Sequence, residues 1–124
     1  MKKSLRRNWP YLFPLLVLSW VIANGPLATW SVETIPTDEA WAFAKSDQAV
    51  FVDVREPDET QSGYLPGAIL MPLSRFEENL DRLPKDKLLL TYCRSGARAK
   101  KASAMLLKAG FKTKAAGGYA QLKH

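Results

Sequence analysis

Residues 88–110 constrain the fold of this chain more than any other stretch. The apolar run Leu88 to Tyr92 is typical of a buried parallel strand, and the run Ala99 to Ala109, closed by Gly110, consists largely of strong helix formers. Between them lies only a short loop, which begins with Cys93, the single cysteine of the chain. A strand that passes so directly into a helix predicts an α/β fold with the thiol at the carboxyl end of a strand, the edge where open α/β sheets bind ligands.

The rest of the chain after residue 33 continues this alternation of strand and helix patterns. Apolar, β-branched runs predict strands, Ser74-Arg75-Phe76-Glu77 fits a helix-opening capping box, and Gly117-Gly118 predicts a turn. The predicted strands are 49–54, 69–71, 88–92 and 111–115, and the predicted helices are 37–44, 56–61, 74–83, 99–109 and 119–123. We therefore expect an α/β fold with a small, open, mainly parallel sheet flanked by helices.

The N-terminal segment has the pattern of a secretory signal. Four Lys/Arg residues among the first seven form a basic n-region, and the apolar, uncharged stretch 9–23 follows. We predict a signal peptide over residues 1–23, cleaved after Ala23, then a linker over 24–32 and the folded domain over 33–124. The alternative is an uncleaved membrane anchor, since about 20 apolar residues span a bilayer. Both interpretations predict a domain outside the cytoplasm, either free in the periplasm or anchored to the inner membrane.

The charges are segregated along the chain. All twelve acidic residues lie between Glu33 and Asp86, whereas residues 87–124 carry nine Lys/Arg and no Asp or Glu. Because the cysteine loop lies in this basic third, we expect it to attract a small anion. The basic residues are spread over a helix and a strand without an aromatic platform, so no nucleic acid partner is expected.

Cys93 is expected to be chemically active. A helix N-terminus presents unpaired N–H groups and positive potential, and Arg94 and Arg98 add fixed positive charge, so the loop favours the anionic, nucleophilic form of sulfur. A lone cysteine cannot form an internal disulfide, and His124, the only histidine, is at the terminus and is not expected to form a Cys-His pair. The alternative is a small buried cysteine that ends a strand. The sequence contains no metal-ligand pattern, and we expect neither a metal nor a cofactor.

Three motifs follow one another in the chain. They are Phe51-Val52-Asp53-Val54-Arg55-Glu56-Pro57, Gly63-Tyr64-Leu65-Pro66-Gly67-Ala68-Ile69 and Cys93-Arg94-Ser95-Gly96-Ala97-Arg98, with Gly110-Phe111 and Gly117-Gly118 after them. In this order they resemble a rhodanese domain, and the resemblance covers about residues 31 to 124. With the N-terminal signal, the whole is similar to the small periplasmic thiosulfate sulfurtransferases of bacteria. The chain departs from the family at Tyr64 and Ala99, where histidine and serine are common.

The resemblance implies sulfur transfer in two half-reactions. Cys93 takes the outer sulfur of thiosulfate, sulfite leaves, and the Cys93 persulfide passes its sulfur to a thiophilic acceptor such as cyanide or a thiol. The loop Arg94-Ser95-Gly96-Ala97-Arg98 is expected to bind the substrate, with its backbone N–H groups forming an anion nest. Arg94 is expected at the opening of the loop, and Arg98 is expected either to contact the substrate or to brace the loop.

Asp53 and Arg55 are expected to support this site. Charged networks near an active site often have a structural role, so we predict ion pairs that fix the loops at the edge of the sheet. The alternative is that Asp53 handles a proton close to the sulfur.

Other functions fit the same residues less well. A phosphatase of related fold needs a larger loop, and only four residues separate Cys93 from Arg98. A non-catalytic rhodanese-like binding module needs neither the cysteine nor both arginines. A persulfide relay to a protein partner uses the same chemistry and stays open.

Overall fold

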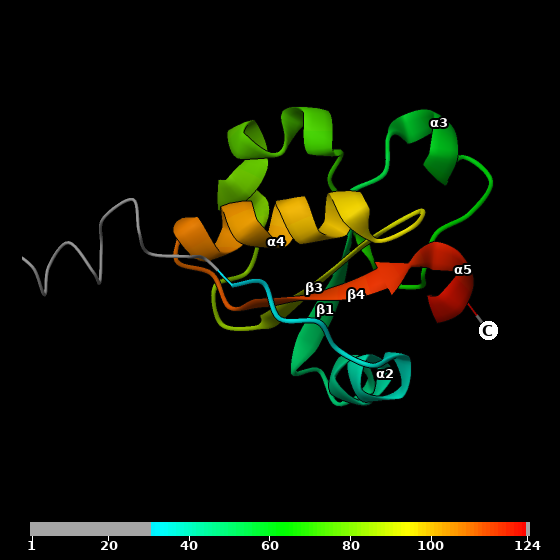
Figure 1. The fold of residues 1–124 in the computed structure, drawn as a ribbon, viewed down its shortest axis with the longest axis horizontal. Coiled ribbons are helices and arrows are strands. Elements are labelled where there is room, and N and C mark those ends of the chain that lie inside the picture. Colours follow the sequence, from blue (N-terminus) through cyan, green and yellow to red (C-terminus); the bar gives the residue numbers. More distant parts are fainter. Residues whose placement is uncertain (1–30, 124) are drawn as a thin grey trace, which may run out of the picture. The chain divides into compact units, whose positions relative to one another are not determined.

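The computed structural model describes residues 31–123, and its centre is a parallel sheet (Figure 1). Its four strands are arranged in the order β2-β1-β3-β4, and all neighbouring strands are paired in parallel. The strands are β1 (Ala49–Asp53), β2 (Ile69–Leu70), β3 (Leu88–Cys93) and β4 (Thr113–Gly118). Thr34 extends the β4 edge by a parallel bridge to Ala115. The predicted α/β fold with a small parallel sheet is confirmed.

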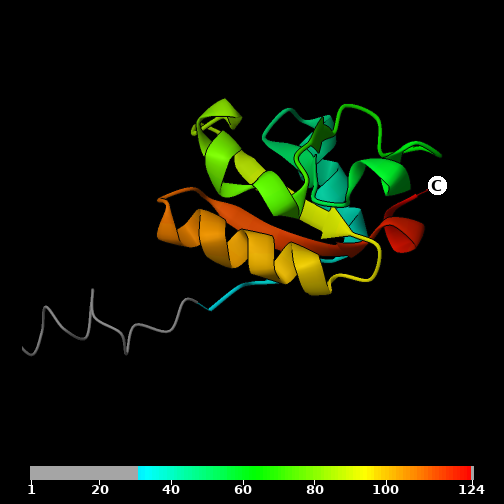
Figure 2. The same ribbon diagram turned by 90° about the horizontal axis from the view of Figure 1, so that it is seen from above.

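Helices cover both faces of the sheet (Figures 1 and 2). On one face lie α4 (Ala97–Lys108) and two short 3-10 helices, Leu73–Arg75 and Glu77–Arg82. The other face is covered by α2 (Thr37–Lys45) and α5 (Tyr119–Leu122), while α3 (Pro57–Thr60) follows β1. Because successive side chains of a strand point to opposite faces, the two central strands, β1 and β3, contribute to both hydrophobic clusters.

α4 packs closely on the sheet because the face that it buries carries small side chains. These buried residues are Ala99, Ala102, Ser103 and Leu106, at helical spacing. The hydroxyl of Thr91 on β3 donates to the carbonyl oxygen of Ala99 at 2.9 Å and lies 2.7 Å from the Ser103 hydroxyl. Ser103 in turn lies 2.9 Å from the hydroxyl of Thr113 on β4. This chain of buried hydrogen bonds fixes the first turn of α4 against the strand that ends in Cys93.

The helix predicted over residues 74–83 is present only as two 3-10 helices, and its predicted opening by a capping box at Ser74 is wrong. The Ser74 hydroxyl donates to Glu56 Oε2 at 2.9 Å, and the Ser74 backbone N–H donates to Glu56 Oε1 at 3.3 Å. Because Ser74 contacts a distant carboxylate, it caps no helix, and the segment forms the two 3-10 helices instead. The capping box of this region lies at α3, between Glu56 and Glu59.

The turn predicted at Gly117-Gly118 is also wrong. Both glycines belong to β4, where they are in register with Tyr92 and Cys93 of β3. A register shift between Thr91 and Tyr92 precedes this pairing. The last strand therefore pairs with β3 from Leu89 onwards and reaches Cys93, the residue that carries the thiol.

The predicted signal peptide, nearly all of the predicted linker, and His124 lie outside the described residues. Among residues 31–123, no helix has the length and apolar character needed to cross a membrane. The same residues contain no group of three or more His, Cys, Asp or Glu side chains placed to hold a metal ion.

Candidate active site

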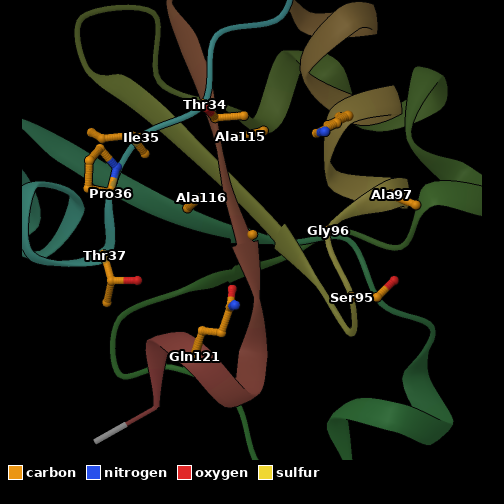
Figure 3. A pocket seen from close by; sticks show the side chains of 12 residues that line it. Thr34, Ile35, Pro36, Thr37, Ser95, Gly96, Ala97, Ala115, Ala116 and Gln121 are labelled. Atoms are coloured by element: carbon orange, nitrogen blue, oxygen red, sulfur yellow. The ribbon is translucent and has the colours of Figure 1, made fainter.

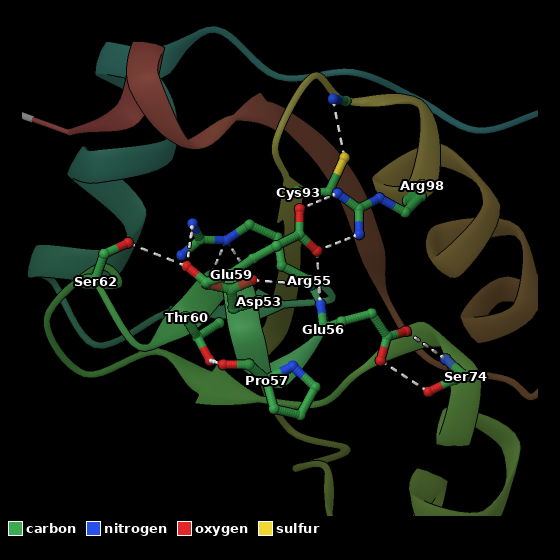
Figure 4. A network of polar contacts seen from close by, with 11 residues as sticks. Asp53, Arg55, Glu56, Pro57, Glu59, Thr60, Ser62, Ser74, Cys93 and Arg98 are labelled. Atoms are coloured by element: carbon green, nitrogen blue, oxygen red, sulfur yellow. Dashed lines mark hydrogen bonds and ion pairs between the residues drawn. The ribbon is translucent and has the colours of Figure 1, made fainter.

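Cys93 is the last residue of β3, and its side chain is buried. Its sulfur lies on the face of the sheet that α4 covers, together with Leu89 of the same strand. The backbone N–H of Gly96 donates a hydrogen bond to Cys93 Sγ at 2.9 Å (Figure 4). The chain thus curls back over the thiol and presents a backbone donor to the sulfur, which is the geometry of an anion-binding loop.

Glycine at position 96 allows the backbone conformation that this turn requires. Its φ angle of 105° lies in the left-handed region, which side chains disfavour, and it directly precedes the first residue of α4. The helix therefore begins beside the sulfur, with its unpaired N–H groups and positive dipole end at the loop. Arg94, Ser95 and Ala97 are exposed, so the loop offers its outer surface to solvent while the thiol lies beneath it.

The end of β4 lies against the cysteine loop, and this close approach depends on glycine. A Cβ atom on Gly118 would lie 2.6 Å from the carbonyl oxygen of Arg94, and one on Gly96 would lie 3.5 Å from Gly117 Cα. The first distance is far below van der Waals contact, so only glycine fits at position 118. The double glycine is visible in the sequence, but its pattern indicates only a turn, and this role of Gly118 is not predicted.

Arg98 is held by a carboxylate. Its Nη1 donates to Glu59 Oε2 and its Nη2 donates to Glu59 Oε1, both at 2.7 Å (Figure 4). Glu59 Oε2 also accepts the backbone N–H of Glu56 at 2.9 Å. These hydrogen bonds, foremost that from Arg98, lower the pKa of Glu59 to about 2. Arg98 therefore braces the first turn of α4 against α3, which favours the bracing role over direct contact with a substrate.

The same pairing raises the pKa of Arg98. Its hydrogen bond to Glu59 is the main cause of the raised pKa, and burial of the guanidinium opposes it in part. Glu59 is not predicted as a site residue, because nothing local in the sequence signals its pairing with a residue 39 positions away.

Asp53 and Arg55 form a buried ion pair on the opposite face of the sheet. Asp53 is in register with Tyr92, which packs in the cluster beneath α2 and α5. The Asp53 carboxylate accepts hydrogen bonds from Arg55 Nη2 at 2.7 Å, from Nε at 3.0 and 3.1 Å, and from the Arg55 backbone N–H at 2.9 Å. Arg55 Nη2 also donates to the carbonyl oxygen of Gly63 at 2.8 Å, and the guanidinium lies 4.2 Å from the centroid of the Tyr119 ring. The pair joins the loops at this edge of the sheet and is directed away from the thiol.

An open groove of about 790 Å³ lies along the outer side of the cysteine loop (Figure 3). It is lined by residues 34–37, 95–97, 100, 115–117 and 121. Neither Cys93, Arg94 nor Arg98 lines it. The groove therefore adjoins the loop without being the pocket of the sulfur itself.

Comparison with known proteins assigns the class of this fold and site. The chain belongs to the rhodanese-like domain family, whose model matches residues 36–123. The match includes every helix and strand from α2 to α5, as well as the cysteine loop.

Sulfurtransferases are among the relatives of this chain. A sulfurtransferase of Allochromatium vinosum is 35% identical over 69 residues, which is 56% of this chain and 64% of the relative. The thiosulfate sulfurtransferase GlpE of Coxiella burnetii is 28% identical over 74 residues, 60% of this chain and 69% of GlpE. A tRNA uridine(34) hydroxylase of Sodalis glossinidius is 37% identical over 84 residues, 63% of this chain but only 24% of that enzyme. The match spans less than two thirds of the A. vinosum protein and about a quarter of the hydroxylase.

Solved structures show the same fold. A rhodanese-like domain protein from Staphylococcus aureus has a TM-score of 0.67 at 30% identity, covering 73% of this chain and 91% of its own. The reduced CoADR-RHD protein of Bacillus anthracis has a TM-score of 0.66 at 32% identity, covering 73% of this chain and 16% of its own. A human single-domain sulfurtransferase, at 24% identity, has a TM-score of 0.63 and covers 73% of this chain and 95% of its own.

Proposed function

We propose that this protein is a sulfurtransferase that moves the sulfane sulfur of thiosulfate, through a persulfide on Cys93, to a thiophilic acceptor such as cyanide or a thiol. One observation carries the proposal: a lone buried thiol lies in an anion-binding loop, with the Gly96 N–H directed at its sulfur at 2.9 Å. The sulfurtransferases among the relatives support the reaction class, and GlpE supports thiosulfate as the donor.

The first half-reaction breaks the sulfur–sulfur bond of thiosulfate. The Cys93 thiolate attacks the outer sulfur, and the electron pair of the broken bond leaves with sulfite. The loop N–H groups and the dipole of α4 stabilise the negative charge on the persulfide that forms. Arg94, exposed beside the loop, is placed to meet the charge of the incoming dianion.

The second half-reaction returns the enzyme to its starting state. The acceptor attacks the terminal sulfur of the persulfide, the bond between the two sulfurs breaks, and its electron pair returns to Cys93 as the thiolate. The Gly96 N–H, which donates to Cys93 Sγ, and the N-terminal end of α4 stabilise the thiolate that returns.

We also propose that the domain acts outside the cytoplasm. The basic n-region and the apolar stretch after it support export to the periplasm, with retention at the inner membrane as the alternative.

Steady-state kinetics test the proposed reaction. We expect the purified protein to form thiocyanate from thiosulfate and cyanide, and the Cys93→Ser variant to form none while keeping its circular dichroism spectrum. Thiocyanate formation by the Cys93→Ser variant would assign the chemistry to another residue. Hydrolysis of an arylphosphate in place of sulfur transfer would support a phosphatase, and a folded protein without either activity would support a binding module.

A further inference from the structure

We propose that Thr91 is a positioning residue for Cys93, and that its buried hydroxyl holds the first turn of α4 at the distance from β3 at which the Gly96 N–H contacts the sulfur. The proposal rests on the sulfurtransferase function proposed above and goes beyond it, because it assigns a part in the reaction to a residue that does not touch the substrate. Three features carry it: the place of Thr91 on β3, the direction of its hydrogen bond and the arrangement of the hydroxyls around it.

Thr91 lies two residues before Cys93 on the same strand, β3. Because side chains two positions apart in a strand point to the same face, the Thr91 hydroxyl and the Cys93 thiol are both directed at the face that α4 covers. The side chain of Thr91 is completely buried. The hydroxyl can therefore act on the reaction only through the groups that it contacts inside the protein.

Both partners of the hydrogen bond to the sulfur are attached to β3. Cys93 is the last residue of the strand, and its Sγ accepts the Gly96 N–H at 2.9 Å (Figure 4). The carbonyl oxygen of Gly96 accepts the Lys100 N–H at 3.1 Å, which joins Gly96 to the first turn of α4. That turn is joined to β3 by the Thr91 hydroxyl, which donates to the carbonyl oxygen of Ala99 at 2.9 Å. The geometry at the sulfur thus depends on this hydrogen bond between strand and helix.

The Arg98 side chain of the same turn is bound in another direction. Its two terminal nitrogens donate to the carboxylate of Glu59, both at 2.7 Å. Glu59 belongs to α3, which follows β1. This ion pair therefore fixes the turn to α3, and it does not set the distance between the turn and β3.

The other hydroxyls of the network leave the Thr91 proton directed at α4. Thr113 on β4 donates to the carbonyl oxygen of Leu89 at 2.8 Å, just as Thr91 donates to that of Ala99. Ser103 lies between the two threonines, 2.7 Å from Thr91 and 2.9 Å from Thr113. Because a hydroxyl has a single proton, Ser103 donates to one threonine at a time, and both threonines can accept. Thr91 is thus the member that holds the first turn, whereas Thr113 contacts the second turn through Ser103.

A small displacement of the first turn is sufficient to affect the reaction. The helix dipole and the unpaired N–H groups act within the first turn of a helix, and their effect falls off beyond it. A longer distance between this turn and β3 weakens the contact of the Gly96 N–H with the Cys93 sulfur. Donor binding should change less, because Arg94, the residue proposed to meet thiosulfate, is exposed and lies outside the hydroxyl network.

The test follows formation of the Cys93 persulfide from thiosulfate in variants of Thr91. Thr91→Val keeps the shape of the side chain but lacks the hydroxyl, and we expect the rate at saturating thiosulfate to fall about five- to tenfold, as for the loss of one hydrogen bond. The half-saturating concentration of thiosulfate should stay unchanged. Thr91→Ser keeps the hydroxyl and lacks the methyl group, so it should lose stability but retain the wild-type rate. Should Thr91→Val not fold, Thr91→Ala carries the same comparison, since it also lacks the hydroxyl.

Thr113→Val is the matched control. It removes a buried hydroxyl of the same network that does not contact the first turn of α4. It should lower the urea midpoint as Thr91→Val does, but leave the rate of persulfide formation unchanged. Equal rate losses in the two valine variants, or in Thr91→Val and Thr91→Ser, would overturn the positioning role. A wild-type rate in folded Thr91→Val would overturn it as well.

Alkylation of Cys93 by iodoacetamide separates this proposal from the proposed function, because it needs no sulfur donor. The thiolate attacks the carbon that carries iodine, and iodide leaves. Thr91→Val should slow this reaction, whereas Thr113→Val should not, and equal alkylation rates in wild type and both variants would overturn the role of Thr91. A wild-type protein that forms no persulfide would overturn the sulfurtransferase function instead, so the two failures are distinct.

Discussion

Arg94 and Arg98 both follow Cys93 closely, yet the structure gives them different environments. Arg98 is bound by both oxygens of Glu59, whereas Arg94 is exposed and has no carboxylate partner among residues 31–123. A guanidinium that already holds a carboxylate is less available to a second anion. We therefore propose a structural role for Arg98 and leave the binding of the anionic donor to Arg94.

The Arg94→Ala variant tests this division. We expect it to raise the thiosulfate requirement of the first half-reaction by roughly 10- to 100-fold, since hydrogen bonds to charged groups contribute about 1.5–3 kcal/mol. The reaction of cyanide with preformed persulfide should change much less, because cyanide is smaller and carries less charge. High salt should reduce the thiosulfate reaction of the wild type in the same way, since exposed charges are screened over about 10 Å at 0.1 M. Equal losses in both half-reactions would show that Arg94 maintains the loop's shape.

The Glu59–Arg98 pair should make stability depend on pH in a defined range. The pKa of Glu59 falls from 4.5 to about 2 in the folded protein, chiefly through its hydrogen bonds with Arg98. Because the folded-state pKa is the lower one, the stabilisation is present above pH 4.5 and is lost as the pH falls towards about 2. We expect Glu59→Gln to lower the urea midpoint at neutral pH, with the difference from wild type shrinking across this range.

Glu77→Gln is the control for this measurement, because Glu77 is exposed and has no ion pair in the described part of the chain. Its urea midpoint should follow that of the wild type at every pH. A difference between wild type and Glu59→Gln that stays constant down to about pH 2 would contradict the pairing as the source of the effect.

At the scale of elements, the position of the cysteine loop depends on its contact with the end of β4. Gly118→Ala would place a Cβ atom 2.6 Å from the Arg94 carbonyl oxygen, and overpacking of this kind typically costs about 1–3 kcal/mol. We expect this variant to lose stability and also to lose sulfurtransferase activity, because the loop must move to relieve the contact. Activity at the wild-type level in the folded variant would show that the loop geometry tolerates this displacement.

The Gly67→Ala variant tests the effect of backbone strain on stability without displacing the cysteine loop. Gly67 has a φ angle of 76°, but nothing lies within 4 Å of the Cβ that would be added. A left-handed conformation costs a non-glycine residue about 1–2 kcal/mol, so stability should fall to a similar degree. Activity, measured where the variant is fully folded, should be retained.

The elements that the sequence predicts correctly are those fixed by local patterns. The apolar run before Cys93, the glycine in the loop and the helix formers after it suffice to place the thiol between a strand and a helix. For residues 74–83 and for Gly117-Gly118 the predictions differ from the structure, because tertiary contacts determine the conformation of both segments. Ser74 has a capping pattern but contacts Glu56, and the two glycines have a turn pattern but pair with β3. The Glu59–Arg98 pair is likewise invisible in any local pattern.

At the scale of the whole molecule, the N-terminal pattern predicts where the protein acts. If residues 1–23 are a cleaved signal, the exported protein begins near Asn24 and is recovered with the soluble periplasmic fraction. N-terminal sequencing of the protein from fractionated cells decides this. Recovery of the full-length chain only in detergent extracts of membranes would favour the anchor.

The net positive charge of residues 87–124 also acts at the scale of the whole molecule. Residues 87–124 contain no acidic residue, so only acidic residues of other segments can neutralise the positive charges of this part. Such ion pairs are present at Lys87, Arg98 and Lys114. Arg94 and Lys100 have none among residues 31–123. The remaining positive potential attracts small anions to this part of the molecule.

The most direct test of the account is the intact mass of the purified protein at each stage of the reaction. After reduction and removal of the reductant, thiosulfate should add the mass of one sulfur atom, and peptide mapping should place it on Cys93. Cyanide should then remove it and restore the starting mass. A folded, reduced protein whose mass does not change with thiosulfate would contradict the persulfide on Cys93, and with it the proposed sulfur transfer.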